Sequence, residues 1–486
     1  MNTNLEALAP SGIWRNFKNL TQIPRPSKKE ARVVEFVKQF GEKLGLETVV
    51  DAVGNVVIRK PATPGMENRK GIIFQSHLDM VPQKNSDKTH DFEKDPIQAY
   101  IDGEWVKANG TTLGADNGIG VASMLYILES DNLKHGPIEC LFTIDEETGM
   151  TGAFELKPNV LKGEILMNLD SEDEGELFIG CAGGMDANIE FEYKTSRIQP
   201  DAKPFLIRIS GLRGGHSGLD IDLGRGNSNQ ILFRLLWNAE SKVGLQLCEF
   251  EGGNMRNAVP REAHAVVLIP SKNVNEFRNL VSDFVQVVKN ELSAVEPEFK
   301  LELTETVMPA RVMEPVLQKN VIAAIYACPN GVIRMTDGIE GLVETSTNLS
   351  IVKTAGEKIQ VNCLLRSSVD SAKQHIADVM KALFELAGAK TAFTGSYPGW
   401  KPNMDSAIMK VMDDVYMKMY NKKMEIKAVH AGLECGIIGG VYPNLDMVSF
   451  GPTIRHPHSP DEKVHIGSVQ KFWDFLVKTL ESVPVK

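Results

Sequence analysis

Two apolar runs in the first 170 residues of the chain end in side chains that can bind a metal. His77 and Asp79 follow the run at 71–76 (GIIFQS), and Asp170 ends the run at 164–169 (EILMNL). In an extended segment, residues two apart point to the same side. Asp79 can therefore fix the tautomer of a metal-binding imidazole at His77. An isolated His-x-Asp pair is otherwise typical of a solvated strand end.

A third apolar run, at 138–144 (IECLFTI), ends in three consecutive carboxylates, Asp145, Glu146 and Glu147. Adjacent carboxylates repel one another, and a divalent cation would offset that repulsion. Neighbouring residues of a strand point in opposite directions. We therefore predict that one glutamate ligates a metal while the other faces the substrate water. A solvated acidic turn is the alternative.

Two further segments offer single ligands. Asp116 lies in GADNG, where small neighbours allow a close backbone approach, at the entry to a helix expected over 119–128. An aspartate there could instead cap the helix. His456 and His458 lie in HPHSP, whose prolines stiffen the loop and lower the entropy cost of holding an imidazole. One of these two histidines is expected to be a ligand.

Together these residues form a donor set for two metal ions. Two histidines, one bridging carboxylate and two terminal carboxylates suit zinc, with cobalt and manganese as substitutes. Two ions about 3.5–4 Å apart can orient a hydroxide and polarise a carbonyl together. A glutamate beside them can act as general base. The residues therefore predict a metal-dependent hydrolase.

The elements that must position these residues alternate between strand and helix. In a doubly wound sheet, function gathers at the carboxyl ends of the strands, which is where the three apolar runs end. The predicted fold class is α/β, with a mostly parallel mixed sheet flanked by helices. This catalytic domain is expected at 1–184 and again at 399–486. Its other expected elements are helices at 29–44, 405–419 and 469–480 and strands at 426–429 and 447–450.

Between these two parts, residues 185–398 have a different texture and predict an inserted α+β domain without an evident repeat. The expected strands are 205–209, 265–269, 300–303 and 359–365, and the expected helices are 227–238, 275–292 and 372–386.

Composition excludes several classes of function. The 486 residues carry a net charge of -10 without a basic block, which argues against a nucleic-acid partner. No apolar run approaches the ~18 residues of a membrane helix, and the first thirty residues lack the apolar core of a secretory signal. The six cysteines are scattered singly, without a CxxC pair. Such thiols fit a reducing compartment, so we expect a cytoplasmic protein without a membrane partner.

The motifs resemble those of the co-catalytic zinc metallopeptidases, a family that includes aminoacylases, glutamate-type carboxypeptidases and carnosine-type dipeptidases. Within it, the resemblance is strongest to the bacterial dipeptidases that cleave Xaa-His substrates, and it runs the whole length of the chain. The motifs that carry it are SHLDMVPQ, GTTLGADNGIG, TIDEETGMTGA, NLDSEDEGE, GGHSG, HAGLECG and FGPTIRHPHSP.

The resemblance implies a role for each of the five ligand candidates. His77 and Asp170 would complete one metal site, and Glu147 and His458 the other. Asp116 would bridge both ions, most simply two zinc ions.

The resemblance also implies the chemistry beside the metals. Glu146 would be the general base that takes a proton from the bridging water and passes it to the leaving amine, and Asp79 would orient His77. The family often has a cis peptide after the bridging aspartate, here between Asp116 and Asn117.

The inserted domain would be the family's lid. His216, in GGHSG, would stabilise the oxyanion. Asn257, Arg366 and Gly432 would bind substrate. The fork of Arg366 suits the terminal carboxylate of a peptide, and Gly432 would offer backbone N–H groups to the same carboxylate. The family's small dimeric members lend a lid histidine across a homodimer. Their lids are about half this size, which leaves open whether His216 serves its own site or a partner's.

Three functions follow as hypotheses. The first is a dipeptidase for small unblocked peptides, with a preference for Xaa-His that rests on resemblance alone. The second is an aminoacylase, tripeptidase or carboxypeptidase with the same metal residues. The third, a binding protein without chemistry, has little support because Glu146 stands beside all five ligand candidates.

Overall fold

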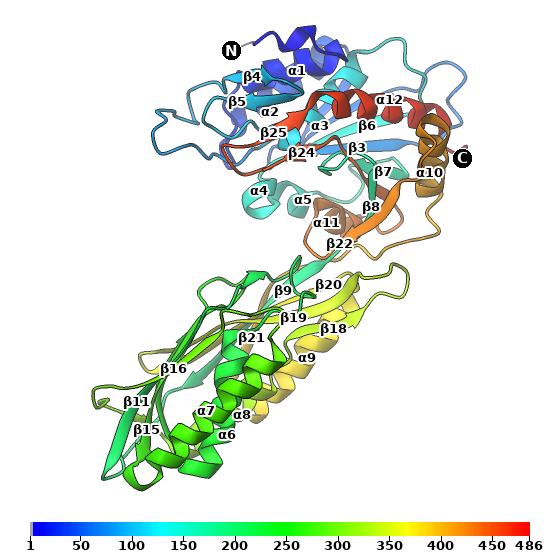
Figure 1. The fold of residues 1–486 in the computed structure, drawn as a ribbon. Helices are drawn as coiled ribbons and strands as arrows, with labels where there is room; N and C mark the ends of the chain where they lie inside the picture. Colours follow the sequence, from blue (N-terminus) through cyan, green and yellow to red (C-terminus); the bar gives the residue numbers. More distant parts are fainter. Residues whose placement is uncertain (1–2) are drawn as a thin grey trace. The chain divides into compact units, whose positions relative to one another are not determined.

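The computed structural model describes residues 3–486, which form two compact units (Figure 1). Unit 1 contains the described residues up to Gly180, together with Trp400–Ala428 and Leu433–Lys486. Unit 2 contains Cys181–Gly399 and the short segment Val429–Gly432. Each unit has its own sheet and its own helices.

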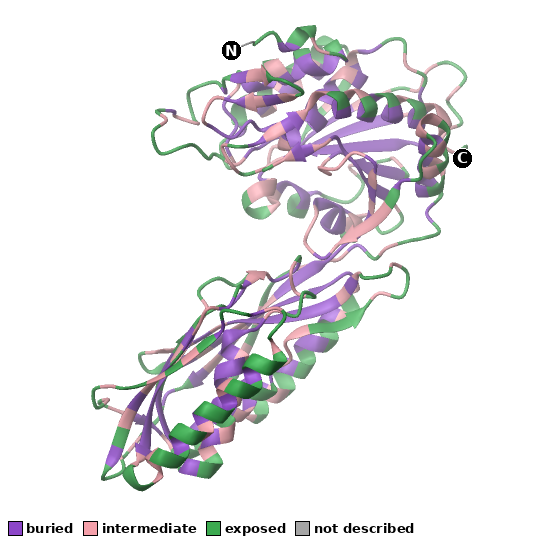
Figure 2. Cartoon of the chain, in the orientation of Figure 1, coloured by how far each residue is buried: buried purple, intermediate pink, exposed green. Residues whose placement is uncertain are grey.

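An eight-stranded mixed sheet forms the centre of unit 1. Its four central strands run parallel, with antiparallel strands on both sides. The order is β1 (Glu47–Val50), β2 (Val56–Lys60), β6 (Ile138–Thr143), β3 (Ile72–His77), β7 (Ile165–Asn168), β23 (Asp446–Ser449), β8 (Glu176–Cys181) and β22 (Glu425–Val429). Every residue of β3, β6 and β7 is buried (Figure 2). Burial on both faces explains why these strands are mainly apolar, with most of their polar side chains near their carboxyl ends.

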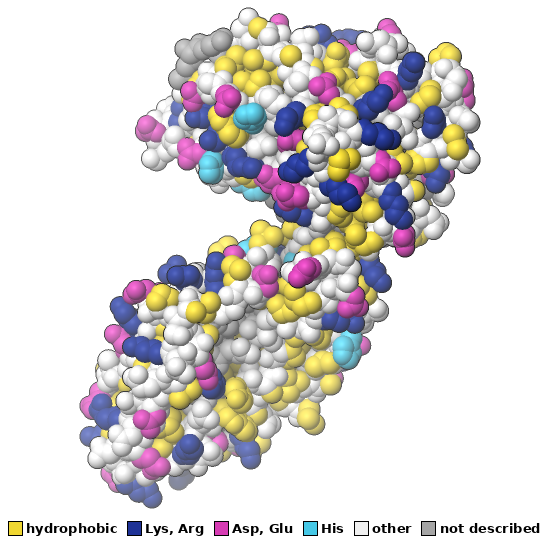
Figure 3. Space-filling view, turned by 45° about the vertical axis from the view of Figure 1, so that its right-hand side comes forward, with side chains coloured by type: hydrophobic (Ala, Val, Ile, Leu, Met, Phe, Trp, Pro, Cys, Tyr) yellow, Lys and Arg dark blue, Asp and Glu magenta, His cyan; other side chains and the backbone are white. Residues whose placement is uncertain are grey.

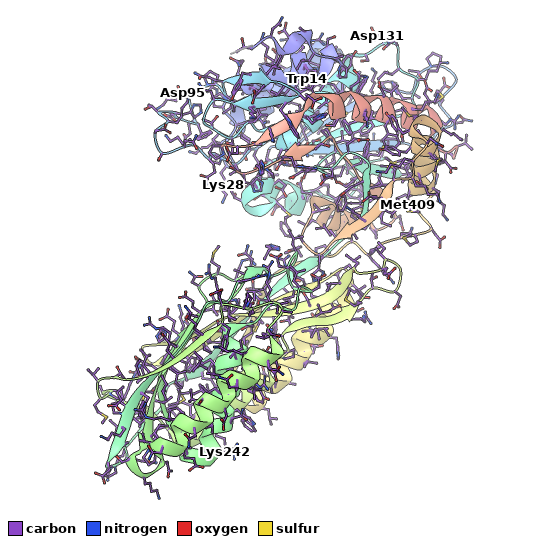
Figure 4. All side chains as sticks on the ribbon, viewed as in Figure 1. Trp14, Lys28, Asp95, Asp131, Lys242 and Met409 are labelled. Atoms are coloured by element: carbon purple, nitrogen blue, oxygen red, sulfur yellow. The ribbon has the colours of Figure 1, made fainter. Side chains whose placement is uncertain are left out.

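Helices and a small second sheet complete unit 1. Trp14 of the first helix is fully buried, and its indole N–H donates to the carbonyl of Ala9 at 3.2 Å (Figure 4). The helices are α1 (Ser11–Thr21), α2 (Ala31–Lys43), α3 (Ala115–Glu129), α4 (Glu146–Gly149), α5 (Thr151–Glu155), α10 (Ala407–Tyr420), α11 (Glu434–Val441) and α12 (Ile466–Ser482). The small sheet has the order β24 (Ile454–Arg455), β25 (Lys463–His465), β5 (Trp105–Ala108) and β4 (Ala99–Asp102).

Unit 2 is a nine-stranded sheet with long helices against one face (Figure 1). Its apolar core lies between the two layers and includes Phe205, Phe233, Phe250 and Phe277. The strands, in sheet order, are β16 (Lys300–Glu305), β11 (Ala202–Ser210), β15 (Ala263–Pro270), β13 (Gln246–Gly252), β19 (Val343–Ala355), β20 (Lys358–Ser367), β9 (Gly183–Glu192) and β21 (Lys390–Tyr397), with β18 (Gly331–Met335) also beside β19. The helices are α6 (Ser228–Val243), α7 (Val274–Glu291), α8 (Pro315–Ala327) and α9 (Asp370–Leu386). Lys242, in the last turn of α6, has the charge that favours a helix carboxyl end (Figure 4).

The α/β sheet and the inserted α+β unit confirm the predicted fold class. One local prediction is wrong. Glu146 and Glu147 do not continue a strand with side chains on opposite sides, because they open the short helix α4. The chain turns at Asp145, which has a φ of 51°.

The surface has mixed charge. Figure 3 shows basic and acidic side chains interspersed over the visible face. Within residues 3–486, none of the helices has the length and apolar character needed to cross a membrane.

Candidate metal centre

Five ligand candidates of unit 1 converge at the carboxyl ends of its parallel strands. Because those ends share one edge of the sheet, side chains far apart in sequence meet there. His77 ends β3, Glu147 lies in α4 directly after β6, Asp170 follows β7, Asp116 lies in the first turn of α3, and His458 lies in the loop between β24 and β25.

Asp116 lies between the two histidines. Its Oδ1 is 3.1 Å from His77 Nε2, and its Oδ2 is 3.3 Å from His458 Nε2. Asp116 and Asn117 have non-helical backbone angles at a kink near the start of α3, and the Asp116 carboxylate faces the two histidines rather than the helix backbone. The peptide between Asp116 and Asn117 is cis, as the resemblance implies. One carboxylate thus presents an oxygen to each of two imidazoles.

Each histidine also meets a second carboxylate. His77 Nε2 is 3.3 Å from Asp170 Oδ1, and His458 Nε2 is 2.9 Å from Glu147 Oε2. Potential ligand atoms of His77, Asp116 and Asp170 lie within 4.8 Å of one another, and so do those of Asp116, Glu147 and His458. The second oxygen of Glu147 is buried without a hydrogen-bond partner. Two sets of N and O donors that share one carboxylate fit two divalent cations of the zinc type.

The acidic surroundings perturb the two imidazoles. Hydrogen bonds with Asp116 and Glu147 raise the pKa of His458 to about 11. Burial lowers the pKa of His77, but Asp170, Asp116 and Asp79 outweigh it and raise that pKa well above its usual value. Metal ligation requires neutral imidazole, so a cation in either set would replace these protons.

Asp79 connects His77 to the helix that carries both glutamates. The Asp79 carboxylate is fully buried, and its Oδ1 lies 3.2 Å from His77 Nδ1. It accepts hydrogen bonds from Ser27 Oγ at 2.8 Å and from the backbone N–H groups of Glu146 at 3.0 Å and Glu147 at 3.2 Å. Burial would raise the pKa of Asp79, but the contacts with His77 and Ser27 lower it to about 2. A carboxylate that is ionised near neutral pH thus contacts both the imidazole of His77 and the start of α4.

Glu146 has the environment of a proton acceptor. One of its carboxylate oxygens lies within 4.8 Å of candidate ligand atoms of His77 and Glu147. Burial raises the pKa of Glu146 well above its usual value, with further contributions from Asp170 and Glu434. A carboxylate with a raised pKa is a stronger base, which suits general base catalysis near neutral pH.

Unit 2 holds the remaining candidates, around Gly218. A Cβ at Gly218 would lie 3.1 Å from His216 Cε1 and 3.2 Å from Arg366 Nε, so these two side chains converge there. Asn257 is exposed, and its carbonyl accepts a hydrogen bond from Ser217 N at 2.9 Å. Gly432 ends the segment Val429–Gly432, which the structure assigns to this unit.

The tautomer of His216 follows from its contacts. Its Nδ1 accepts hydrogen bonds from the backbone N–H groups of Gly218 at 3.1 Å and Leu219 at 3.0 Å. Burial and the charge of Arg366 lower its pKa. The neutral ring therefore carries its proton on Nε2 and can donate it. Arg366 is buried, donates from Nη1 to the hydroxyl of Tyr397 at 3.4 Å, and leaves its Nε without a hydrogen-bond partner.

Two further buried side chains, Glu434 in unit 1 and His430 in unit 2, were not found from the sequence. Glu434 accepts hydrogen bonds from Gln75 Nε2 at 2.6 Å and Thr143 Oγ1 at 2.9 Å, and burial raises its pKa to about 8. His430 shares a 2.7 Å hydrogen bond with Ser346 Oγ, and burial together with Arg366 lowers its pKa to about 3. Both lie in HAGLECG, whose only signal was charged and polar residues within an otherwise apolar stretch.

A mixed sheet whose parallel strands end in two donor sets with one shared carboxylate defines the class of metal-dependent hydrolases, and sequence comparison assigns the family. The profile of peptidase family M20/M25/M40 matches residues 73–482. The chain belongs to this family, which confirms the resemblance drawn from its motifs.

Individual relatives are similar over the full length. The cytosol non-specific dipeptidase of Escherichia coli (strain K12) is 45% identical over 484 residues, covering 100% of both chains. The crystal structure of aminoacylhistidine dipeptidase from Vibrio alginolyticus is 49% identical, covers 99% of both chains and superposes with a TM-score of 0.96. The aminopeptidase PepT structure from Bacillus cereus ATCC 10987 covers 98% of this chain and 99% of its own, with a TM-score of 0.58 and 17% identity, a likeness of fold.

Proposed function

We propose that this protein is a metal-dependent dipeptidase that hydrolyses small unblocked dipeptides, Xaa-His dipeptides among them. The observation that carries the proposal is Asp116, whose two oxygens face His77 and His458 while Glu146 lies beside the same site. The two full-length relatives, named as a non-specific and an aminoacylhistidine dipeptidase, support the substrate class. The Escherichia coli relative is named a cytosol dipeptidase, which supports a cytoplasmic location for this protein.

Five side chains would hold the cofactor. His77 and Asp170 would hold one divalent ion, Glu147 and His458 would hold the other, and Asp116 would contribute an oxygen to each, with zinc as the best match to the donors. When bound, the two ions supply Lewis acidity for the scissile carbonyl and the attacking water.

The chain's own residues then move the protons. Glu146 accepts a proton from the attacking water and delivers it to the leaving amine, for which its raised pKa is suited. The Asp79 carboxylate lies 3.2 Å from Nδ1 of His77 and accepts a hydrogen bond from the N–H of Glu146, so that base and ligand keep their relative positions.

Unit 2 supplies the groups for substrate recognition. His216, as the donor of an Nε2–H, would stabilise the developing oxyanion. Arg366, with Asn257 and the backbone of Gly432, would bind the terminal carboxylate of the peptide. Recognition of a free carboxylate would favour dipeptides with a free carboxyl end over dipeptides in which that end is blocked.

The experiment compares the wild type with Glu146→Gln on a panel of substrates. We expect cleavage of glycyl-histidine, β-alanyl-histidine and glycyl-leucine, loss of activity with a chelator, and recovery on adding Zn²⁺. Glu146→Gln should bind wild-type amounts of metal yet lose at least ~10²-fold in kcat. Glu155→Gln, an exposed glutamate of α5 paired with Lys157, is the matched control.

Several outcomes would contradict the proposal. Near-normal turnover by metal-loaded Glu146→Gln would exclude the mechanism. Strong cleavage of N-acetyl amino acids or of tripeptides, without cleavage of dipeptides, would favour an aminoacylase or a tripeptidase of the same family. Binding of metal without hydrolysis of any member of the panel would favour a binding protein.

A further inference from the structure

Four consecutive backbone N–H groups, those of residues 113–116, donate to a single side chain, Glu462. Its Oε2 accepts from Leu113 N at 2.7 Å and Gly114 N at 2.9 Å. Its Oε1 accepts from Ala115 N at 2.7 Å and Asp116 N at 3.2 Å. The segment is the one that carries the candidate bridging carboxylate, so Glu462 holds the backbone of Asp116 itself.

The carboxylate of Glu462 is shielded from water. Glu462 is 2% exposed, so water does not compete for either oxygen. The first N–H groups at the start of a helix lack partners within the helix and form an anion site when they point together. Here the N–H groups of Ala115 and Asp116 open α3, those of Leu113 and Gly114 come directly before it, and a carboxylate from the far end of the chain accepts from all four.

Glu462 belongs to the loop that carries the second candidate histidine. It lies four residues after His458, and its own N–H donates to the carbonyl of Ser459 at 3.0 Å. The next residues form β25, which pairs with β5 through Lys463↔Lys107 and Val464↔Val106. The side chain therefore joins the loop of His458 to the loop of Asp116 at a point that the small sheet already fixes.

Arg25 holds the same segment from its carbonyl side. It is 3% exposed, and its Nη1 donates to the carbonyls of Leu78 and Asp79 at 2.8 Å each. Its Nη2 donates to the carbonyl of Gly114 at 2.5 Å. Gly114 has a φ of 70°, and a Cβ there would lie 2.7 Å from this guanidinium, which explains the glycine at this position.

We propose that Glu462 is a positioning residue for the metal centre, which sets Asp116 against His458 by fixing the backbone of one loop from the other. Arg25 extends the same support to the segment that follows His77. The inference rests on the proposed function, because it takes these side chains as metal ligands. Residues that orient metal ligands typically change metal affinity about 10–100-fold when they are replaced.

The test uses the full-length protein with its metal removed. Glu462→Gln keeps the size of the side chain but replaces one acceptor oxygen by an N–H₂ group. Glu462→Asp keeps the charge but is one methylene shorter. Glu139→Gln is the matched control: this buried glutamate of unit 1 accepts from Lys162 N at 2.6 Å and Gly163 N at 2.8 Å, at the other end of the parallel strands.

Two measurements separate positioning from general stability. The first is the dissociation constant for Zn²⁺, from competition with a chelating dye. The second is the increase in Tm on adding Zn²⁺, which grows with metal affinity because metal binds only the folded state. We expect Glu462→Gln to weaken Zn²⁺ binding about 10–100-fold and to reduce the Zn²⁺-induced increase in Tm, with Glu462→Asp between it and the wild type. Glu139→Gln should lower Tm by the same amount with and without Zn²⁺.

These measurements test the role of Glu462 independently of the proposed dipeptidase activity. Wild-type Zn²⁺ affinity in a folded Glu462→Gln would overturn the inference, whatever the protein hydrolyses. Failure of both Glu462 variants to fold, even with Zn²⁺, would also overturn it, because the residue would then serve folding alone. A wild type that binds Zn²⁺ but cleaves no dipeptide would refute the dipeptidase activity and leave the role of Glu462 intact.

Discussion

Replacing Asp79 by asparagine tests the support of the candidate metal centre most directly. The carboxylate contacts His77 on one side and accepts the backbone N–H groups of Glu146 and Glu147 on the other. Asparagine has the same shape, but it lacks the charge, and its N–H₂ group must face one set of donors. We therefore expect Asp79→Asn to change stability, metal affinity and turnover together.

The stability lost in Asp79→Asn follows from these contacts. If the amide oxygen keeps Glu146 N, the N–H₂ group faces Glu147 N and Ser27, and a buried N–H without an acceptor costs about 1–3 kcal/mol. The lowered pKa of Asp79 gives the size of the stability loss in a second, independent way. Its fall from 3.8 to about 2 corresponds to about 2 kcal/mol in the metal-free protein. A lowered carboxyl pKa stabilises the folded state above pH 4, and this contribution is lost as the pH falls from 4 to 2.

The assay has three parts. Urea unfolding of the metal-free proteins at pH 7 should show Asp79→Asn less stable by about 2 kcal/mol. Competition with a chelating dye should show Zn²⁺ binding weakened about 10–100-fold, because the imidazole of His77 loses its charged partner. At saturating Zn²⁺, kcat should remain at least ~10-fold lower, because Glu146 is no longer held in place. Asp102→Asn, an exposed residue paired with Lys107, is the control. An Asp79→Asn protein with wild-type Zn²⁺ affinity and kcat would refute the reasoning.

Three further predictions concern unit 2. Burial and Arg366 hold the pKa of His430 at about 3, below its usual 6.5, so its contribution to stability is present above pH 6.5 and lost as the pH falls towards 3. His430→Asn should make the Tm less dependent on pH between 6.5 and 4, and an unchanged pH profile would contradict this. Arg366→Lys should raise KM for a dipeptide about 10-fold or more but leave KM for the C-terminal amide of the same dipeptide nearly unchanged. An equal increase in both KM values would exclude a contact between Arg366 and the carboxylate. Gly253→Ala should lower the free energy of unfolding in urea by more than the about 1–2 kcal/mol of a left-handed alanine, because its Cβ would lie 1.8 Å from the carbonyl of Ser350. Gly356→Ala, also at positive φ but with open space, should show only that smaller cost.

The sequence predicted the central strands of unit 1 because their pattern is nearly unambiguous. An apolar run that stops at charged residues is typical of a buried parallel strand, and the expected run at 138–144 matches β6 (Ile138–Thr143) to within a residue. The clustering of His77 and Asp170 follows, since parallel strands bring their carboxyl ends to one edge.

What the sequence did not predict depends on contacts between distant segments. The turn at Asp145, which makes a helix of Glu146 and Glu147, is stabilised by hydrogen bonds to Asp79, and no local pattern encodes those bonds. Glu462 appeared to be an ordinary acidic loop residue, because its four donors lie more than 340 positions earlier in the chain. Spacing rules find ligands, but they do not find the residues that hold ligands from another segment.

The structure also separates two explanations for the aspartate of GADNG. A helix cap would have its carboxylate directed at the first N–H groups of α3. Instead, Glu462 binds the N–H groups of residues 113–116, and Asp116 itself has non-helical backbone angles at the kink near the start of α3. Both oxygens of Asp116 therefore face the imidazoles of His77 and His458. One carboxylate satisfies the backbone at the start of the helix, which leaves a second carboxylate, in the same turn, directed at the site where the proposed metals would bind.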